Sequence, residues 1–69
     1  MDVSYNKLFK LLIDKGLKKL EFANQIGISP STLAKMSRNE TVSMDVIIRI
    51  CRKFECGVDD IMEILPETK

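Results

Sequence analysis

Small hydroxyl side chains and a lysine follow a glycine near the middle of this 69-residue chain. Ser31 and Thr32 can hydrogen-bond either to a base edge or to a phosphate, and Lys35 can donate to the O6 or N7 atom of guanine. Gly27 separates these residues from a preceding helical pattern, and a glycine turn between two short helices is typical of a helix-turn-helix. In that unit the first helix lies across a phosphate backbone and the second enters the major groove. The spacing therefore indicates a DNA-binding module.

Two short helices are predicted to position these side chains. The first spans residues 19–26 and ends at Gly27. The second begins with Ser29 as its N-cap and Pro30 at its first position, where the missing N–H of proline costs nothing. The residues of the two helices that we expect in the core are apolar and helically spaced: Phe22, Ala23, Ile26, Leu33 and Met36.

Three further helices complete the predicted fold. One spans residues 5–15 and ends at Gly16, and another begins after Ser43 as its N-cap. The last is expected over residues 58–65, before Pro66. The helix after Ser43 is apolar on two sides and should be the most buried element, through Val46, Ile47, Ile50, Cys51 and Phe54. Because no segment shows the period of a strand, the predicted fold class is all-α, a compact five-helix bundle.

Composition narrows the class of protein. A chain that is 45% hydrophobic and 30% charged suits one ordered helical domain over residues 1–69. No apolar run approaches ~20 residues, so no transmembrane helix is expected. The N-terminus lacks the basic region and apolar core of a signal peptide. We therefore expect a cytoplasmic protein without a membrane partner.

The charge distribution is more informative than the net charge of +1. Residues 1–20 hold five lysines against two aspartates, a net charge of +3. Residues 41–69 hold four basic against six acidic residues, a net charge of −2. This asymmetry suggests a basic end that faces DNA and an acidic far end.

The two cysteines, Cys51 and Cys56, could form a disulfide or half of a metal site. With no histidine in the chain and no second cysteine pair, zinc would have too few ligands. Both cysteines also fall at apolar positions of the helical pattern. We expect buried, reduced thiols that pack as small hydrophobes, and no metal site.

An acidic group near the C-terminus could imitate paired catalytic carboxylates. Asp59, Asp60 and Glu63 lie at or near the start of a predicted helix, where the helix dipole favours anions. The chain has no histidine and no glycine-rich phosphate loop. We therefore expect no enzymatic activity, no cofactor and no small-molecule substrate.

The ordered set of these features resembles the Cro/phage-repressor (XRE) type of helix-turn-helix domain. The resemblance covers about residues 6–62 and is greatest to small stand-alone members of the family. In the motif itself it rests on Gly16-Leu17, Phe22-Ala23, Ile26-Gly27-Ile28-Ser29 and Ser31-Thr32-Leu33. In the later helices it rests on Val46-Ile47, Ile50-Cys51, Phe54 and Val58-Asp59-Asp60-Ile61.

The resemblance implies which residues would contact DNA. The start of the recognition helix meets base edges in such domains, which corresponds to Ser29, Pro30, Ser31 and Thr32, with Lys35 one turn later. Phosphate contacts are implied at the start of the preceding helix and in the loop after the recognition helix, here Lys18, Lys19, Arg38, Asn39 and Thr41. Phosphate contacts fix the register, whereas base contacts carry the sequence information.

Two residues depart from the family pattern. Lys18 stands where the family often has a serine or threonine N-cap, so a cap is lost and a cation is gained. Pro30 stands where many members have a glutamine or arginine that reads a base. Because proline cannot hydrogen-bond a base edge, apolar contact with a thymine methyl group is favoured there.

The implied function is a sequence-specific transcriptional regulator, a repressor, that binds double-stranded operator DNA as a homodimer. One recognition helix covers about one half-site, so two copies are needed. The expected dimer surface involves Met62, Ile64 and Leu65, although these could instead pack on the first helix. The alternative is a protein-interaction module, such as an antitoxin or anti-repressor, with weak or no DNA binding. The low net charge and Pro30 favour this alternative slightly.

Overall fold

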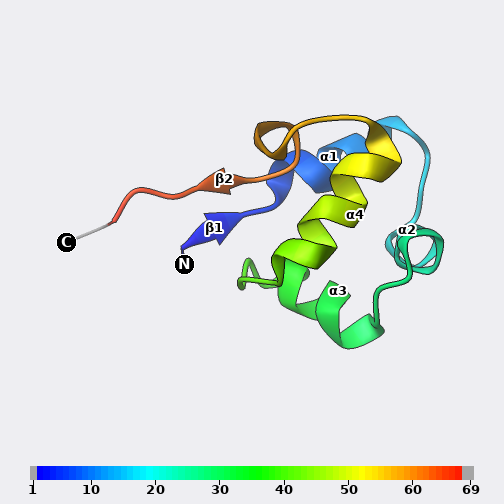
Figure 1. Ribbon diagram of the computed structural model, residues 1–69, viewed down its shortest axis with the longest axis horizontal. Helices are drawn as coiled ribbons and strands as arrows, with labels where there is room; N and C mark the ends of the chain where they lie inside the picture. The colour runs from blue at the N-terminus through cyan, green and yellow to red at the C-terminus, as the bar shows by residue number, and fades with distance from the viewer. Residues whose placement is uncertain (1, 68–69) are drawn as a thin grey trace.

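Four helices, one short 3₁₀ helix and a two-stranded ribbon make up residues 2–67, the part of the chain that the structure, a computed structural model, describes. In chain order the elements are β1 (Val3–Ser4), α1 (Asn6–Asp14), α2 (Lys19–Ile26), α3 (Pro30–Ser37), α4 (Met44–Phe54), η1 (Val58–Asp60) and β2 (Glu63–Ile64) (Figure 1). Within residues 2–67, every helix is too short or too polar to cross a membrane.

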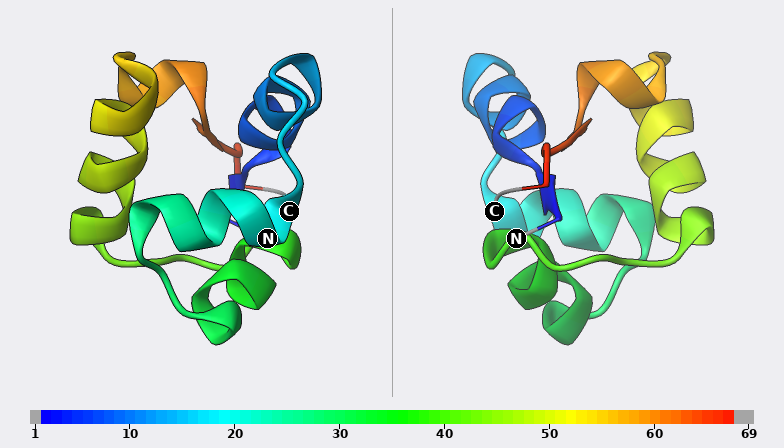
Figure 2. Two further views of the ribbon diagram at one scale, coloured as in Figure 1. Left: turned by 90° about the vertical axis from the view of Figure 1, so that its right-hand side faces the viewer. Right: turned by 90° about the vertical axis from the view of Figure 1, so that its left-hand side faces the viewer.

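The centre of the helical part is α2. It packs against α1, α3 and α4, and Figure 2 shows it running between α1 and α4 with α3 below. Phe22 of α2 is fully buried, and its ring stacks on that of Phe54 with 5.9 Å between the centroids. Ala23 is also buried, and its small side chain lets a neighbouring helix approach closely. The predicted core residues of α2 and α3 are all buried: Phe22, Ala23, Ile26, Leu33 and Met36.

The prediction that α4 is the most buried element is wrong. Only Ile47 and Ile50 of this helix are buried. Met44 is 64% exposed and Ile48 is 41% exposed. The reason lies in the arrangement, because α4 forms one outer side of the molecule in Figure 2 and turns only one face to the core.

The structure of the C-terminal segment also differs from the prediction of a fifth helix. Residues 58–65 do not form a fifth helix; they form η1 and the strand β2, which pairs antiparallel with β1. The fold is therefore a mostly helical domain with four helices and a ribbon. In the ribbon the residue pairs that lie opposite each other are Val3 with Ile64 and Ser4 with Glu63.

Backbone hydrogen bonds explain why this segment is extended. The N–H of Leu8, in the first turn of α1, donates to the carbonyl oxygen of Ile61 at 3.1 Å. The N–H of Leu65 donates to the carbonyl oxygen of Asp2 at 2.9 Å. A helix over residues 58–65 would use the Ile61 carbonyl internally and leave a first-turn donor of α1 without this partner. The ribbon segment thus supplies hydrogen-bond partners to α1 as well as to its own strands.

Candidate nucleic-acid interface

The start of α3 presents a cluster of three hydroxyl groups. The Oγ atom of Ser29 lies 3.0 Å from Ser31 Oγ and 3.0 Å from Thr32 Oγ1. It also accepts a hydrogen bond from the backbone N–H of Thr32 at 3.2 Å, so Ser29 is the N-cap that the sequence predicts. Each hydroxyl has one donor and two lone pairs. If Ser29 donates to one neighbour and accepts from the other, one O–H group remains to meet an incoming acceptor.

Lys35 extends this polar surface along α3. It is exposed and stands four residues after Ser31, so the two side chains share one face of the helix. Lys35 also lines a polar pocket of about 380 Å³ at the end of α3, together with Asp2, Arg38, Asn39, Glu40 and Thr41. The structure therefore brings Lys35 together with the three predicted phosphate ligands of the following loop.

The turn between α2 and α3 is fixed by its own backbone conformation and by a contact from α4. Gly27 has a φ of +73°, in the left-handed region that glycine adopts without strain. Its carbonyl oxygen accepts a hydrogen bond from Arg49 Nη1 of α4 at 3.1 Å. Arg49 in turn pairs with Asp45 at 3.2 Å. Sequence reasoning missed Arg49 because the contact joins residues that are 22 positions apart.

The loop after α3 is fastened to the N-terminal segment. Asn39 has a φ of +58°, and its Oδ1 atom accepts a hydrogen bond from the N–H of Tyr5 at 3.1 Å. The hydroxyl of Tyr5 donates to the carbonyl oxygen of Glu40 at 2.8 Å. Tyr5 is only 1% exposed, and this burial raises the pKa of its hydroxyl against a smaller lowering effect of the Val42 backbone. The sequence pattern places Tyr5 in the core but does not reveal that it fixes this loop.

Arg38, in the loop after α3, already forms an ion pair with another residue of the chain. Arg38 Nε forms an ion pair of 2.5 Å with Glu40 Oε2. Both side chains are about half exposed, with 60% and 48% of their surfaces accessible. Water screens such a pair, so its strength is modest and a phosphate could compete for the guanidinium. Glu40 is thus a residue of the site that the sequence analysis did not single out.

At the start of α2, Lys18 and Lys19 are both exposed. Lys18 occupies the N-cap position without a side-chain cap, and its backbone N–H donates instead to Glu21 Oε1 at 3.2 Å. The ammonium of Lys19 lies 4.4 Å from the centre of the Phe9 ring, a cation–π contact that gives this lysine a preferred position. The Glu21 carboxylate therefore stabilises the start of α2 in part, where the Lys18 side chain forms no cap.

The two cationic regions flank α3. Figure 1 shows α2 on one side of α3 and the loop that joins α3 to α4 on the other. The hydroxyl cluster and Lys35 lie on α3 between them. A recognition helix in a major groove has a phosphate backbone on each side, so this arrangement can pair cations with both backbones while α3 faces the base edges.

Comparison with known proteins agrees with this geometry. The family model of the Cro/C1-type helix-turn-helix DNA-binding domain matches residues 7–67. Among solved structures, the crystal structure of transcriptional regulator VanUg is similar, with 52% sequence identity and a TM-score of 0.90. The match covers 96% of this chain and 88% of that chain. No curated protein matches the chain.

Proposed function

Since the chain belongs to the family of Cro/C1-type helix-turn-helix DNA-binding domains, we propose that it is a transcriptional repressor that inserts α3 into the major groove of operator DNA. The observation that carries the proposal is the exposed start of α3, where hydroxyl groups cluster one turn before Lys35. The name of the similar protein VanUg, a transcriptional regulator, supports the regulatory role. Binding to chromosomal DNA would place the protein in the cytoplasm.

We assign the proposed contacts by position on the motif. Base edges would meet the first turn of α3 and the lysine that follows it: Ser29, Pro30, Ser31, Thr32 and Lys35. Phosphates would meet the two flanking regions: Lys18, Lys19, Arg38, Asn39 and Thr41. Within these sets Lys35 has the strongest base-reading chemistry, because its ammonium can donate to guanine. Pro30 offers only apolar contact, which suits a thymine methyl group.

We also propose that two copies bind together, through the ribbon. Half-sites about one helical turn apart require paired recognition helices. Of the three residues expected at the dimer surface, Met62 and Leu65 are half buried, whereas Ile64 in β2 is 75% exposed. The ribbon extends away from the helices in Figure 1, so a partner that pairs with it would leave α3 uncovered. Ile64 is therefore the proposed centre of the contact.

Selection of bound sequences from a random pool of duplex DNA tests this function. The expected result is one enriched sequence with two-fold symmetry, and half-sites about 10 base pairs apart. Affinity for the selected duplex should fall steeply as salt rises, because phosphate contacts release counterions. A pool that shows no enrichment, with no retardation of any duplex at low salt, would refute the proposal.

Two observations favour a second candidate, a protein-interaction module. The net charge is only +1, and Glu40 neutralises part of Arg38. Both features weaken attraction to phosphate. The pool selection distinguishes the candidates, because a protein-interaction module would enrich no sequence.

A further inference from the structure

The end of α4 places the two cysteines side by side. Glu55, the C-cap of α4, is left-handed with a φ of +51°, and the N–H of Cys56 donates to the carbonyl oxygen of Cys51 at 3.0 Å. This bond, across a left-handed residue, defines a Schellman motif. In that motif the side chains at these two positions usually contact each other. The thiols of Cys51 and Cys56 are accordingly close enough to hydrogen-bond to each other.

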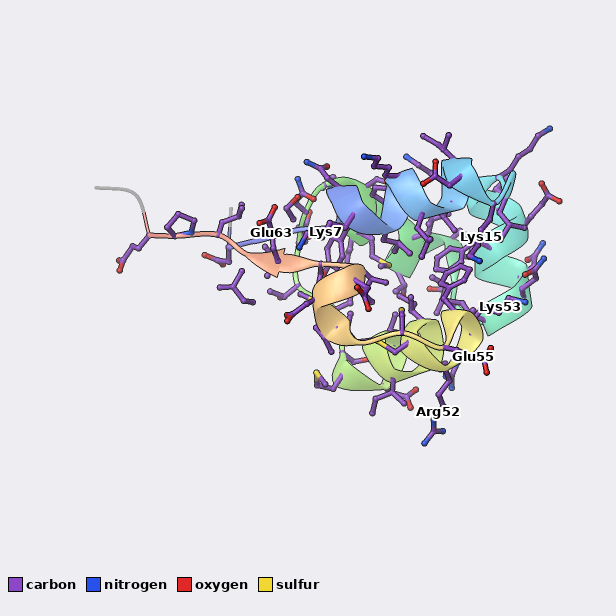
Figure 3. The ribbon with its side chains drawn as sticks, turned by 90° about the horizontal axis from the view of Figure 1, so that it is seen from above. Lys7, Lys15, Arg52, Lys53, Glu55 and Glu63 are labelled. Atoms are coloured by element: carbon purple, nitrogen blue, oxygen red, sulfur yellow. The ribbon has the colours of Figure 1, made fainter. Side chains whose placement is uncertain are left out.

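Both thiols open onto one pocket. They line a cavity of about 560 Å³ between α4 and η1, whose other walls include Ile48, Val58 and Met44. Neither cysteine is in a disulfide, and both pack against the core but are half buried rather than buried as predicted. Figure 3 places Arg52, Lys53 and Glu55 at this end of α4. The pocket is thus a mostly apolar space that gives solutes access to two sulfur atoms.

The electrostatics favour the protonated form of the Cys56 thiol. Burial raises the pKa of the Cys56 thiol, and neighbouring Cys51 and Asp60 raise it further, while Lys15 lowers it slightly. A hydrogen bond with the Cys51 thiol acts in the same upward direction. Protonated thiols are poor nucleophiles, which argues against a role in covalent catalysis. A metal ion that binds thiolates displaces such protons on coordination.

We propose that Cys51 and Cys56 form a two-coordinate site for a soft monovalent cation, Cu(I). Thiolates select soft ions of this kind. Binding would convert Cu⁺ and two thiols into one bis-thiolate complex with charge −1 and release two protons. Two thiolates on opposite sides of one ion hold it in linear coordination, and the thiols of Cys51 and Cys56 already lie within hydrogen-bonding reach of each other.

The surrounding residues limit the site to two ligands. The part of the chain that the structure describes has no group of three or more His, Cys, Asp or Glu residues that could hold a metal ion. Zinc, which takes four ligands in structural sites, is therefore a poor fit. Met44 also lines the pocket but lies seven residues before Cys51, about 10 Å away along the helix axis. This separation argues against a third bond from its thioether, because a methionine side chain on a helix points back toward the N-terminus, away from Cys51.

Anaerobic titration of the reduced protein with Cu(I), in competition with a chromophoric Cu(I) chelator, tests the proposal. We expect one Cu(I) per chain, protection of both thiols from alkylation, and no binding of Zn²⁺ at the same concentration. Cys51→Ser and Cys56→Ser should each abolish the site. Met44→Leu is the matched control, since it removes a sulfur atom from the same pocket and should bind Cu(I) as the parent does.

Three results would overturn the proposal. They are unchanged Cu(I) binding in either serine variant, loss of binding in Met44→Leu, or one Cu(I) bridging two chains by mass. Circular dichroism identifies any serine variant that has lost the helical fold. In that case the rate at which the thiols of the parent protein are alkylated with and without Cu(I) decides the question, and equal rates refute the proposal. The site does not depend on the proposed DNA-binding role, so a failed DNA selection would leave this result intact.

Discussion

Asn39 offers the sharpest test of how the loop after α3 is held. Its Oδ1 atom accepts from the N–H of Tyr5 at 3.1 Å, and its backbone is left-handed with a φ of +58°. Asparagine tolerates this conformation better than most residues that carry a Cβ atom. The residue therefore combines a side-chain role with a backbone role, and three substitutions separate them.

The expected magnitudes follow from these two roles. Asn39→Gly keeps the left-handed backbone and loses the acceptor, so it should lower the free energy of unfolding by about 1 kcal/mol, the typical net value of a hydrogen bond. Asn39→Ala also loses the acceptor, and alanine has a Cβ atom without the local hydrogen bonding by which asparagine tolerates this region, so it should cost roughly 1 kcal/mol more than the glycine variant. Asn39→Asp retains an oxygen acceptor and should change stability least.

Urea unfolding followed by circular dichroism measures all three free energies. The order Asp, Gly, Ala from least to most destabilised supports the reasoning. Equal loss in the glycine and alanine variants would show that the left-handed backbone costs nothing. A glycine variant as stable as the parent would show that the bond to Tyr5 contributes nothing, and the loop would then need another explanation.

The remaining predictions concern binding, pH and assembly. Lys35→Ala should weaken specific binding by roughly 1–3 kcal/mol and relax preference at one base pair per half-site, which a repeated pool selection would reveal. Arg38→Ala should weaken binding to all duplexes alike and lower the salt slope by up to about one unit. Glu40→Gln should do the reverse in the same gel-shift titration, because it frees Arg38 from its ion pair. The bond from the Tyr5 hydroxyl should stabilise the fold fully below pH 10.0 and be lost as pH rises through the raised folded pKa; Tyr5→Phe should remove this alkaline loss in thermal melts. Ile64→Glu should give a monomer in analytical ultracentrifugation under conditions where the parent associates, whereas Ile13→Glu, at a position that is 77% exposed on α1, should not.

Local signals explain why the helix-turn-helix could be predicted from the sequence. Ser29 caps α3 and Pro30 follows at its first position, so the start of this helix depends on adjacent residues alone. Gly27 ends α2 for a similarly local reason, its left-handed backbone. The apolar spacing then determines which faces are buried, and Phe22 and Met36 are indeed fully buried.

The predictions fail for segments whose structure depends on contacts with distant parts of the chain. The span 58–65 has a helical apolar pattern, yet Leu8 and Asp2 take up its backbone groups from more than 50 positions away. Likewise, the pattern of α4 cannot show that one apolar face lies at the outside of the bundle. The bonds of Tyr5 to the loop after α3 span 34 and 35 positions. None of these contacts leaves a signature in the spacing of neighbouring residues.

The small net charge has a consequence for the proposed recognition. Non-specific affinity depends on the number of phosphates that cations neutralise, and this chain has few cations in excess. Arg38 contributes less than a free arginine because Glu40 lies against it, and Lys19 is partly engaged by the Phe9 ring. Discrimination between sites would then depend on base contacts at the start of α3 and on the pairing of two copies. A regulator built in this way should release random DNA readily while retaining a symmetric operator, since pairing doubles every contact that a single domain makes.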